Sequence, residues 1–149
     1  MKEVYVEEKA WQQLLNHFGQ EAGKNLEAMG LLLGEVFRHE GRDWVFVKEY
    51  VTASNNASAV SVRFAEEAFR DLIPRIASGI KKNLVVSWAH SHPGYGCFLS
   101  ATDLATQRNF FNEPFSVALV VDPVKNQKKF FRLNESGYEE VSFAVVRKK

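Results

Sequence analysis

The fold of this chain is decided by one stretch, LVVSWAHSHPGYGCFLSATD, which occupies residues 84–103. Its first five residues are largely apolar and β-branched, and they predict a buried strand. Pro93 and Gly94 should end this strand, because proline cannot donate a hydrogen bond to a β-ladder. A glycine-rich loop then leads to Ser100, and residues 101–108 predict a helix. The stretch therefore predicts a strand, a loop and a helix in close succession.

Imidazole and carboxylate groups are concentrated around the end of the predicted strand. Alternate residues of a strand share one face, so His90 and His92 should point the same way and Ser91 the opposite way. Asp103 should lie in the first turn of the helix and face back toward the strand end. Two imidazoles and a carboxylate suit Zn²⁺ and would leave a fourth position for water, as in a catalytic zinc site. The pattern favours a metallohydrolase.

Each part of this pattern also has an ordinary structural explanation. An isolated His-x-His pair is more often a surface or core accident than a metal site. Ser100 and Asp103 are typical of a helix start, because serine is a preferred N-cap and an acidic residue in the first turn complements the helix dipole. The two explanations are compatible. All the parts fall within 14 residues at a strand end, where functional residues concentrate, and this favours the metal site.

The same residues resemble the metal motif of the JAMM (MPN+) metalloprotease family. That motif is His-x-His, ten residues and then Asp, with Ser three residues before the Asp. The string from His90 to Asp103 is especially similar to the proteasome-lid deubiquitinase and the COP9 signalosome deneddylase of this family. LEAMGLLLGE, residues 26–35, looks like the first-strand segment that carries the family's glutamate. EPFSVALVVDP, residues 113–123, matches the strand after the metal-bearing helix.

The resemblance implies a fold and covers the chain from about residue 4 to about residue 132. The expected fold class is α/β: an MPN (JAMM) domain with a mixed, mostly antiparallel central sheet flanked by helices, similar to the deaminase fold. Because 149 residues are enough for a hydrophobic core, we expect a single domain over residues 1–149.

The resemblance also implies the roles of five residues. One Zn²⁺ per chain would be held by His90, His92 and Asp103. Glu27 would act as general base and then as general acid, and Ser100 would donate to the developing oxyanion. From the residues alone, Glu27 is not distinguished from four competing glutamates, Glu35, Glu49, Glu66 and Glu67.

The implied substrate is a peptide or isopeptide bond after the C-terminal Gly-Gly tail of ubiquitin or a ubiquitin-like protein. In the family, the segment corresponding to about residues 52–62 can pair with this tail as an added strand. The lid and signalosome enzymes carry a second insertion and C-terminal helices for a partner MPN subunit, whereas this chain stops at Lys149. We therefore expect either a stand-alone, prokaryotic-type enzyme or a trimmed form, and a proteasome-like or MPN partner stays open.

Three alternatives are weighed against this interpretation. A JAMM peptidase that processes small sulfur-carrier proteins would carry the same motif. A non-catalytic MPN scaffold would have lost metal ligands, but His90, His92 and Asp103 are all present. A nucleoside deaminase on a related fold would need a Pro-Cys-x-x-Cys pair, and this chain has only one cysteine.

Composition and charge exclude several classes of partner. The net charge is +1, without a basic stripe, so nucleic acid is not expected. No apolar run approaches the roughly 20 residues that span a bilayer, and the N-terminus lacks the apolar core of a signal peptide. Cys97 cannot form an intrachain disulfide, since it is the only cysteine. A role as a thiol nucleophile is the alternative, but it is disfavoured because the neighbours of Cys97 already resemble metal ligands. We expect a cytoplasmic protein without membrane contact.

The rest of the chain predicts alternating helices and strands without repeats. The amphipathic spacing of Trp11, Leu14, Leu15 and Phe18 predicts the first helix. The predicted elements are a helix at 7–19, strands at 29–37 and 44–51 around a turn at 41–43, a polar loop at 52–59, a short strand at 60–64, a helix at 65–77 that Pro74 interrupts, strands at 84–90, 116–122 and 128–133, and a hairpin-like return at 138–146.

Overall fold

The structure is a computed structural model that describes residues 2–52 and 84–147. The strand predicted at 60–64, the helix predicted at 65–77 and most of the polar loop before them lie outside the described residues. The described elements are β1 (Val4–Glu7), α1 (Glu8–Ala22), β2 (Met29–His39), β3 (Arg42–Thr52), β4 (Leu84–Ser91), α3 (Ala101–Phe110), β5 (Val117–Asp122), β6 (Gln127–Asn134), β7 (Gly137–Val141) and β8 (Phe143–Val146).

The described strands form one mixed sheet in the order β7-β6-β5-β4-β2-β3-β1-β8. The β4–β5, β1–β3 and β1–β8 pairs are parallel, whereas the β2–β3, β2–β4, β5–β6 and β6–β7 pairs are antiparallel. The α/β class with a mixed, mostly antiparallel sheet is therefore confirmed. Neither described helix is long and apolar enough to cross a membrane.

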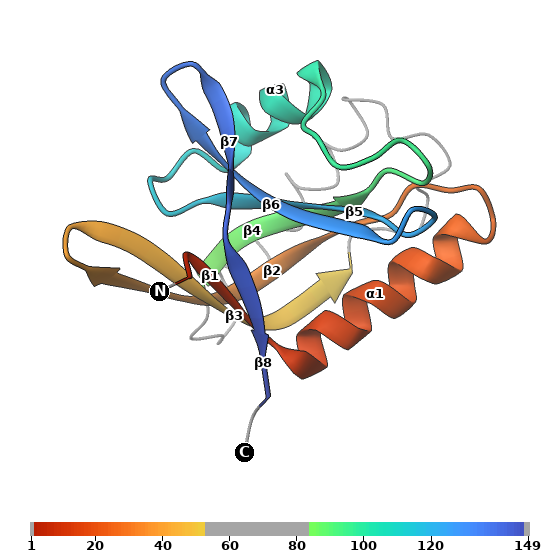
Figure 1. Ribbon diagram of the computed structural model, residues 1–149, viewed down its shortest axis with the longest axis horizontal. Helices are drawn as coiled ribbons and strands as arrows, with labels where there is room; N and C mark the ends of the chain where they lie inside the picture. The colour runs from red at the N-terminus through yellow and green to blue at the C-terminus, as the bar shows by residue number, and fades with distance from the viewer. Residues whose placement is uncertain (1, 53–83, 148–149) are drawn as a thin grey trace.

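The two edges of this sheet are joined by one segment of chain. β7 pairs with β6, and β8 pairs with β1, with only Ser142 between them. Figure 1 shows β7 and β8 as a long ribbon that runs from one edge to the other. The backbone N–H groups of Glu3 and Val4 donate to the Ser142 carbonyl at 3.2 and 3.1 Å. The predicted return at 138–146 is therefore divided at Ser142, because the chain changes partner strand there.

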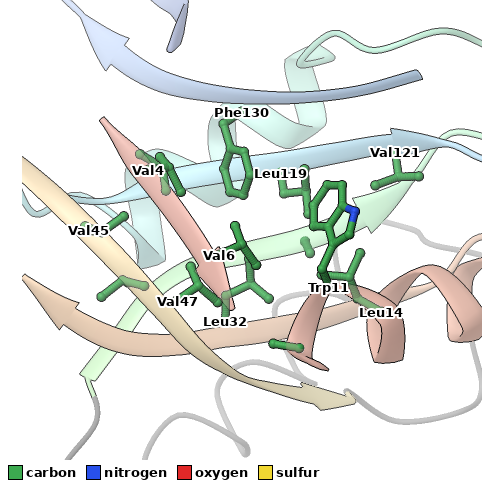
Figure 2. Packing of buried hydrophobic residues seen from close by; sticks show 14 of the residues in the cluster. Val4, Val6, Trp11, Leu14, Leu32, Val45, Val47, Leu119, Val121 and Phe130 are labelled. Atoms are coloured by element: carbon green, nitrogen blue, oxygen red, sulfur yellow. The ribbon is translucent and has the colours of Figure 1, made fainter. Parts of the chain in front are cut away.

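One face of the sheet is covered by α1. The buried side chains Trp11, Leu14 and Phe18 form the inner face of this helix, as its amphipathic spacing predicts. They join a buried cluster with alternate residues of the strands, and Figure 2 shows the two sets packed together. The labelled members are Val4, Val6, Trp11, Leu14, Leu32, Val45, Val47, Leu119, Val121 and Phe130. The helix continues past Gly19, where the prediction ended it, to Ala22.

The opposite face of the sheet is packed around β2 and the loop and helix after β4. Met29, Leu31 and Leu33 of β2 are buried there with Trp88 of β4 and with Leu99. Since Leu32 is buried on the α1 side, β2 has buried side chains on both faces. This confirms the prediction of a central strand, because only a strand covered on both sides reads as a continuous apolar run.

One predicted turn has the wrong boundaries, and one short strand was not predicted. The turn after β2 is formed by Glu40 and Gly41, with φ of 51° and 79°, and Arg42 already belongs to β3. Two-residue hairpin turns of this kind need positive φ at both positions, which glycine adopts without strain. β1, only four residues long, was not predicted; it is defined by its long-range pairing with β3 and β8.

Strand register determines where the candidate site lies. In the antiparallel β2–β4 pair, Met29 lies opposite His90, at the start of β2 and the end of β4. In the parallel β4–β5 pair, His90 lies opposite Val120 near the end of β5. The chain that precedes β2 is thus brought next to the chain that follows β4.

Candidate metal centre

His90 and His92 lie at the end of β4 with their ring nitrogens facing each other. The two Nε2 atoms are 3.0 Å apart, and both side chains are buried. Ser91 between them points to the other side, where its Oγ accepts a hydrogen bond from the Ala28 N–H at 2.8 Å. The alternation predicted from the strand period is confirmed.

Asp103 reaches the two histidines from the first turn of α3. Its Oδ2 lies 3.1 Å from His90 Nε2 and 3.2 Å from His92 Nε2. The Asp103 N–H donates to Ser100 Oγ at 3.1 Å, and the Ser100 N–H donates to Asp103 Oδ2 at 3.0 Å. The predicted N-cap is therefore confirmed as a reciprocal capping box. The Asp103 carboxylate therefore takes part in the helix cap and faces both histidines at the same time.

The three side chains form a donor set that fits a zinc ion. One ligand atom from each residue lies within 4.8 Å of the others. Ligands at about 2.0–2.1 Å from a tetrahedral zinc ion would lie about 3.3 Å from one another. The observed separations of 3.0, 3.1 and 3.2 Å are close to that value. The backbone and rotamers alone already bring the donors to metal-binding distance.

The protonation of His92 also suits metal binding. Its Nδ1 lies 3.2 Å from the Gly96 carbonyl oxygen. A carbonyl can only accept, so this contact requires a proton on Nδ1, which leaves Nε2 as the nitrogen that would bind a metal once it carries no proton. The sequence alone does not identify this acceptor. It depends on Gly96, whose φ of 84° is a conformation that glycine adopts readily.

His90 is oriented by stacking. Its ring lies 4.3 Å from the Trp88 ring, with 5° between the planes. Trp88 Nε1 donates to Gln107 Oε1 at 2.5 Å, and Gln107 Nε2 donates to the Phe111 carbonyl at 3.0 Å. Because Gln107 lies one helical turn after Asp103, this buried pair fixes α3 against β4. His90 Nδ1 is buried and has no hydrogen-bond partner among the described residues.

The charges of the three ligands depend on one another in the absence of metal. Burial alone would raise the pKa of the Asp103 carboxyl, but the charge of His90 and hydrogen bonds from His90, His92 and the Ser100 amide hold it well below its usual range. Burial lowers the pKa of His92, yet its hydrogen bond to Asp103 and the Asp103 charge outweigh burial and raise it. The carboxylate is therefore ionised, as a metal ligand must be.

Glu27 lies in the loop between α1 and β2, beside this donor set. It lines a pocket of ≈ 320 Å³ together with all three candidate ligands, Ser100, Thr102, Tyr95 and Phe98. Burial raises the pKa of the Glu27 carboxyl, although the charges of His92 and His90 oppose the rise and Asp103 supports it. The structure brings together all five residues that the sequence analysis selected. The other three lining residues, Tyr95, Phe98 and Thr102, were not selected from the sequence.

Glu35, which competed with Glu27 in the sequence, lies elsewhere. It is on β2 opposite Phe46, and its Oε1 accepts from Lys48 Nζ at 2.7 Å. It does not line the pocket that contains the histidines. A larger pocket, of ≈ 590 Å³, is lined by residues of α1 and by the end of β3. It shares no lining residue with the pocket of the three candidate metal ligands.

The loop after His92 is fixed by a buried carboxylate that sequence reasoning missed. Asp122 at the end of β5 accepts hydrogen bonds from the N–H groups of Gly94, Gly96, Val124 and Lys125, at 2.7 to 3.0 Å. These bonds outweigh the effect of burial and lower the pKa of Asp122. The Gly96 carbonyl that orients His92 is held through this carboxylate. In the sequence, the available signal for Asp122 was an aspartate at the end of an apolar strand, immediately before Pro123.

Cys97 does not have the environment of an activated nucleophile. Its Sγ donates to the Val120 carbonyl at 3.3 Å, and burial raises the pKa of the thiol. A thiol nucleophile needs a lowered pKa and an accessible thiolate. The geometry therefore disfavours the alternative of a cysteine hydrolase.

Fold and donor set together define a class of protein: an α/β domain with a His-His-Asp group that could hold a metal ion, placed where a strand leads into a helix. The sequence model described as JAB1/Mov34/MPN/PAD-1 ubiquitin protease matches residues 1–113. The chain belongs to this family, which includes the JAMM enzymes whose motif it resembles.

Curated relatives fall in the same family. The chain is 33% identical over 141 residues to ubiquitin carboxyl-terminal hydrolase RPN11 of Saccharomyces cerevisiae, covering 90% of this chain and 44% of that protein. It is 33% identical over 138 residues to 26S proteasome non-ATPase regulatory subunit 14 of Drosophila melanogaster (85% and 40%). It is 28% identical over 146 residues to COP9 signalosome complex subunit 5 of Candida albicans (83% and 23%). The chain spans less than half the length of these relatives.

A solved structure shares the fold at lower sequence similarity. Protein DSY2949 from Desulfitobacterium hafniense superposes with a TM-score of 0.61 at 21% identity, over 97% of this chain and 94% of that one. This likeness supports the fold alone.

Proposed function

We propose that this chain is a zinc-dependent peptidase or isopeptidase that cleaves after the C-terminal Gly-Gly tail of ubiquitin or a ubiquitin-like protein. The observation that carries the proposal is one pocket lined by His90, His92 and Asp103 together with Glu27 and Ser100. Family membership supports it, as does the printed name of the yeast relative, a ubiquitin carboxyl-terminal hydrolase.

One zinc ion per chain would be held by the Nε2 atoms of the two histidines and by the Asp103 carboxylate. Zinc in such a site supplies Lewis acidity and activates water for attack on a carbonyl. The chain's own contribution is a set of donors already within 3.2 Å of one another and mostly shielded from solvent. A preformed site lowers the cost of ordering the ligands when the ion binds.

Glu27 would move the proton. Its carboxyl group faces the pocket from a half-buried position, and its pKa is raised by burial. A carboxylate with a raised pKa accepts a proton from water more readily at neutral pH and can then deliver it to the leaving amine. This sequence of base and then acid is the one that hydrolysis of an amide requires.

Ser100 would bind the developing oxyanion. Its Oγ accepts the Asp103 N–H and lines the pocket. A hydroxyl that accepts one hydrogen bond keeps its own O–H for donation, so the cap does not prevent Ser100 from donating to substrate. The helix start would thus hold the hydroxyl in a fixed place.

The part of the substrate that enters the pocket would be a narrow, extended peptide. Tyr95 and Phe98 are aromatic residues on the pocket lining, with exposed fractions of 66% and 42%. Glycines let a peptide backbone approach such a site closely, because they lack a Cβ. Processing of small sulfur-carrier proteins would use the same tail chemistry. The cytoplasmic location, the prokaryotic type and an MPN or proteasome-like partner stay predictions.

The test is a cleavage assay on a panel of Gly-Gly-tailed ubiquitin, ubiquitin-like and sulfur-carrier fusions, with and without a chelator. Gly-Gly fusions should be cleaved only with zinc, and matched Ala-Ala fusions should be cleaved at least 10-fold more slowly. Equal rates on Gly-Gly and Ala-Ala tails would remove the ubiquitin-like assignment while leaving a metalloprotease.

A further inference from the structure

Ser91 is the residue between the two candidate histidine ligands, and it takes no part in binding the metal. Its side chain is fully buried and lies on the face of the sheet opposite to the histidines. The proposed function assigns it no role.

The backbone N–H and C=O groups of Ala28 both form hydrogen bonds with Ser91. The Ser91 N–H donates to the Ala28 carbonyl at 3.0 Å, and the Ala28 N–H donates to Ser91 Oγ at 2.8 Å. In a regular antiparallel ladder the second bond would go to the backbone carbonyl of the facing residue. Here the last paired residues are Met29 and His90, and a side-chain oxygen replaces the carbonyl immediately after them.

This replacement has a direct consequence for Glu27, which immediately precedes Ala28. Met29 packs on the same side as Trp88, whereas Ala28 is buried on the α1 side. By alternation, Glu27 falls on the histidine side, and its place on the pocket lining agrees. The Ser91 hydroxyl therefore binds the chain one residue away from the proposed proton acceptor.

We propose that Ser91 is a positioning residue that holds Glu27 at working distance from the metal ligands. The inference rests on the proposed function for its effect on turnover. Ala28 is almost fully buried, so its N–H needs a protein partner. Without the hydroxyl, the segment must shift or admit water to satisfy that N–H. A shift of about 1 Å in a catalytic group can lower turnover by as much as 10².

The test compares Ser91→Ala with Ser87→Ala. Ser87 is a matched control: it is also fully buried on β4, but its Oγ donates to the adjacent Trp88 carbonyl and does not contact the Glu27 segment. In the zinc-loaded enzyme, Ser91→Ala should lower kcat by about 10- to 100-fold with KM and zinc content unchanged. Ser87→Ala should stay within about 3-fold, and Ser91→Thr, which keeps a hydroxyl, should recover most of the loss. Loss of zinc in Ser91→Ala, or equal loss of kcat in both alanine variants, would overturn the proposal.

A double-mutant cycle separates positioning from general damage. In a Glu27→Gln background, Ser91→Ala should lower kcat by less than about 3-fold, because the group that Ser91 positions no longer works. If the two losses multiply instead, Ser91 acts on something other than Glu27 and the inference is wrong.

Amide hydrogen exchange gives a readout that does not depend on activity. The Ala28 amide should exchange at least 10-fold faster in Ser91→Ala than in the wild type, while the Leu32 amide should be unchanged. Unchanged Ala28 exchange would contradict the inference. If the wild-type protein cleaves no Gly-Gly fusion, the proposed function fails, and this exchange result still decides whether Ser91 holds the segment before β2.

Discussion

Glu27 lies two residues before β2 and Glu35 lies within it, and the surroundings of the two glutamates differ. Glu27, just before the strand, is half-buried in the pocket with the histidines, where burial raises its pKa. Glu35, within the strand, has 43% of its side chain exposed and is bound to Lys48 at 2.7 Å. Glu35 does not line the pocket that contains the histidines, so it cannot exchange a proton with a group held there. Position in the fold, rather than residue type, makes Glu27 the candidate for proton transfer.

Substitution of the metal ligands should have the largest effect on cleavage, because Glu27 then has no metal beside it. His92→Ala or Asp103→Ala should reduce bound zinc from about one per chain to nearly none and abolish cleavage. The fold should survive, because the cluster under α1 is separate from the ligands. Elemental analysis measures the bound zinc, and circular dichroism checks that the fold survives. A wild-type protein that takes up no zinc after reconstitution would contradict the metallohydrolase proposal itself.

Exchanging the glutamates one at a time tests the comparison directly. Glu27→Gln keeps the shape of the side chain and removes the proton acceptor, so kcat should fall by about 10²–10⁴ with zinc retained. Glu35→Gln is the matched control, and kcat should change by less than a few-fold. Steady-state kinetics with zinc analysis measure both. The reverse result would make Glu35, rather than Glu27, the proton acceptor.

Ser100 allows a finer division, between binding the oxyanion and capping α3. Ser100→Ala should lower kcat by about 10²–10³ and stability by about 1 kcal/mol. Ser100→Gly is a sharper variant, because glycine is a tolerated N-cap and should reduce stability by only a few tenths of a kcal/mol, with the same loss of kcat. Melting temperature and turnover are measured together. If turnover survives in both variants, Ser100 is only a cap.

The smallest effect on turnover is expected at Asp122, which acts on the loop after His92. Asp122→Asn replaces an acceptor oxygen with a donor group facing backbone N–H groups, so stability at neutral pH should fall by about 1–3 kcal/mol. Turnover of the zinc-loaded protein should change by only a few-fold. The exposed Glu135 offers a control, since Glu135→Gln should stay within about 0.5 kcal/mol.

The stability difference between the wild type and Asp122→Asn should depend on pH with a defined sign. The pKa of Asp122 is lower in the folded protein than in the unfolded chain, so the folded state binds fewer protons. Its contribution is present above the ordinary pKa of an aspartate and is lost as the pH falls through the folded pKa. Melting curves of wild type and Asp122→Asn should therefore converge in acid. A constant gap at every pH would show that the variant acts through packing rather than charge.

The sequence was most informative where function and local spacing coincide. His90, His92 and Ser91 follow from strand alternation, and Ser100 with Asp103 follows from helix capping, because each depends on neighbours within a few residues. Glu27 could be selected only through the family resemblance, since its approach to the histidines depends on the pairing of β2 with β4.

Contacts between distant parts of the chain could not be predicted in the same way. The Trp88–Gln107 bond joins residues 19 apart, and the Gly94–Asp122 bond joins residues 28 apart. Neither residue pair has a local pattern that reveals its partner. β1 is the extreme case: four residues, too short for a periodicity, become a strand because two other strands flank them.

The pairing of β1 with β8 has a consequence for synthesis on the ribosome. The Glu3 N–H meets Ser142 across a separation of 139 residues. At translation rates of about 5–20 residues per second, roughly 7–28 s pass between the two. During this interval β1 has no β8 to pair with, and a strand edge stays open to other chains. Until β8 emerges, the nascent protein therefore carries an open strand edge at β1.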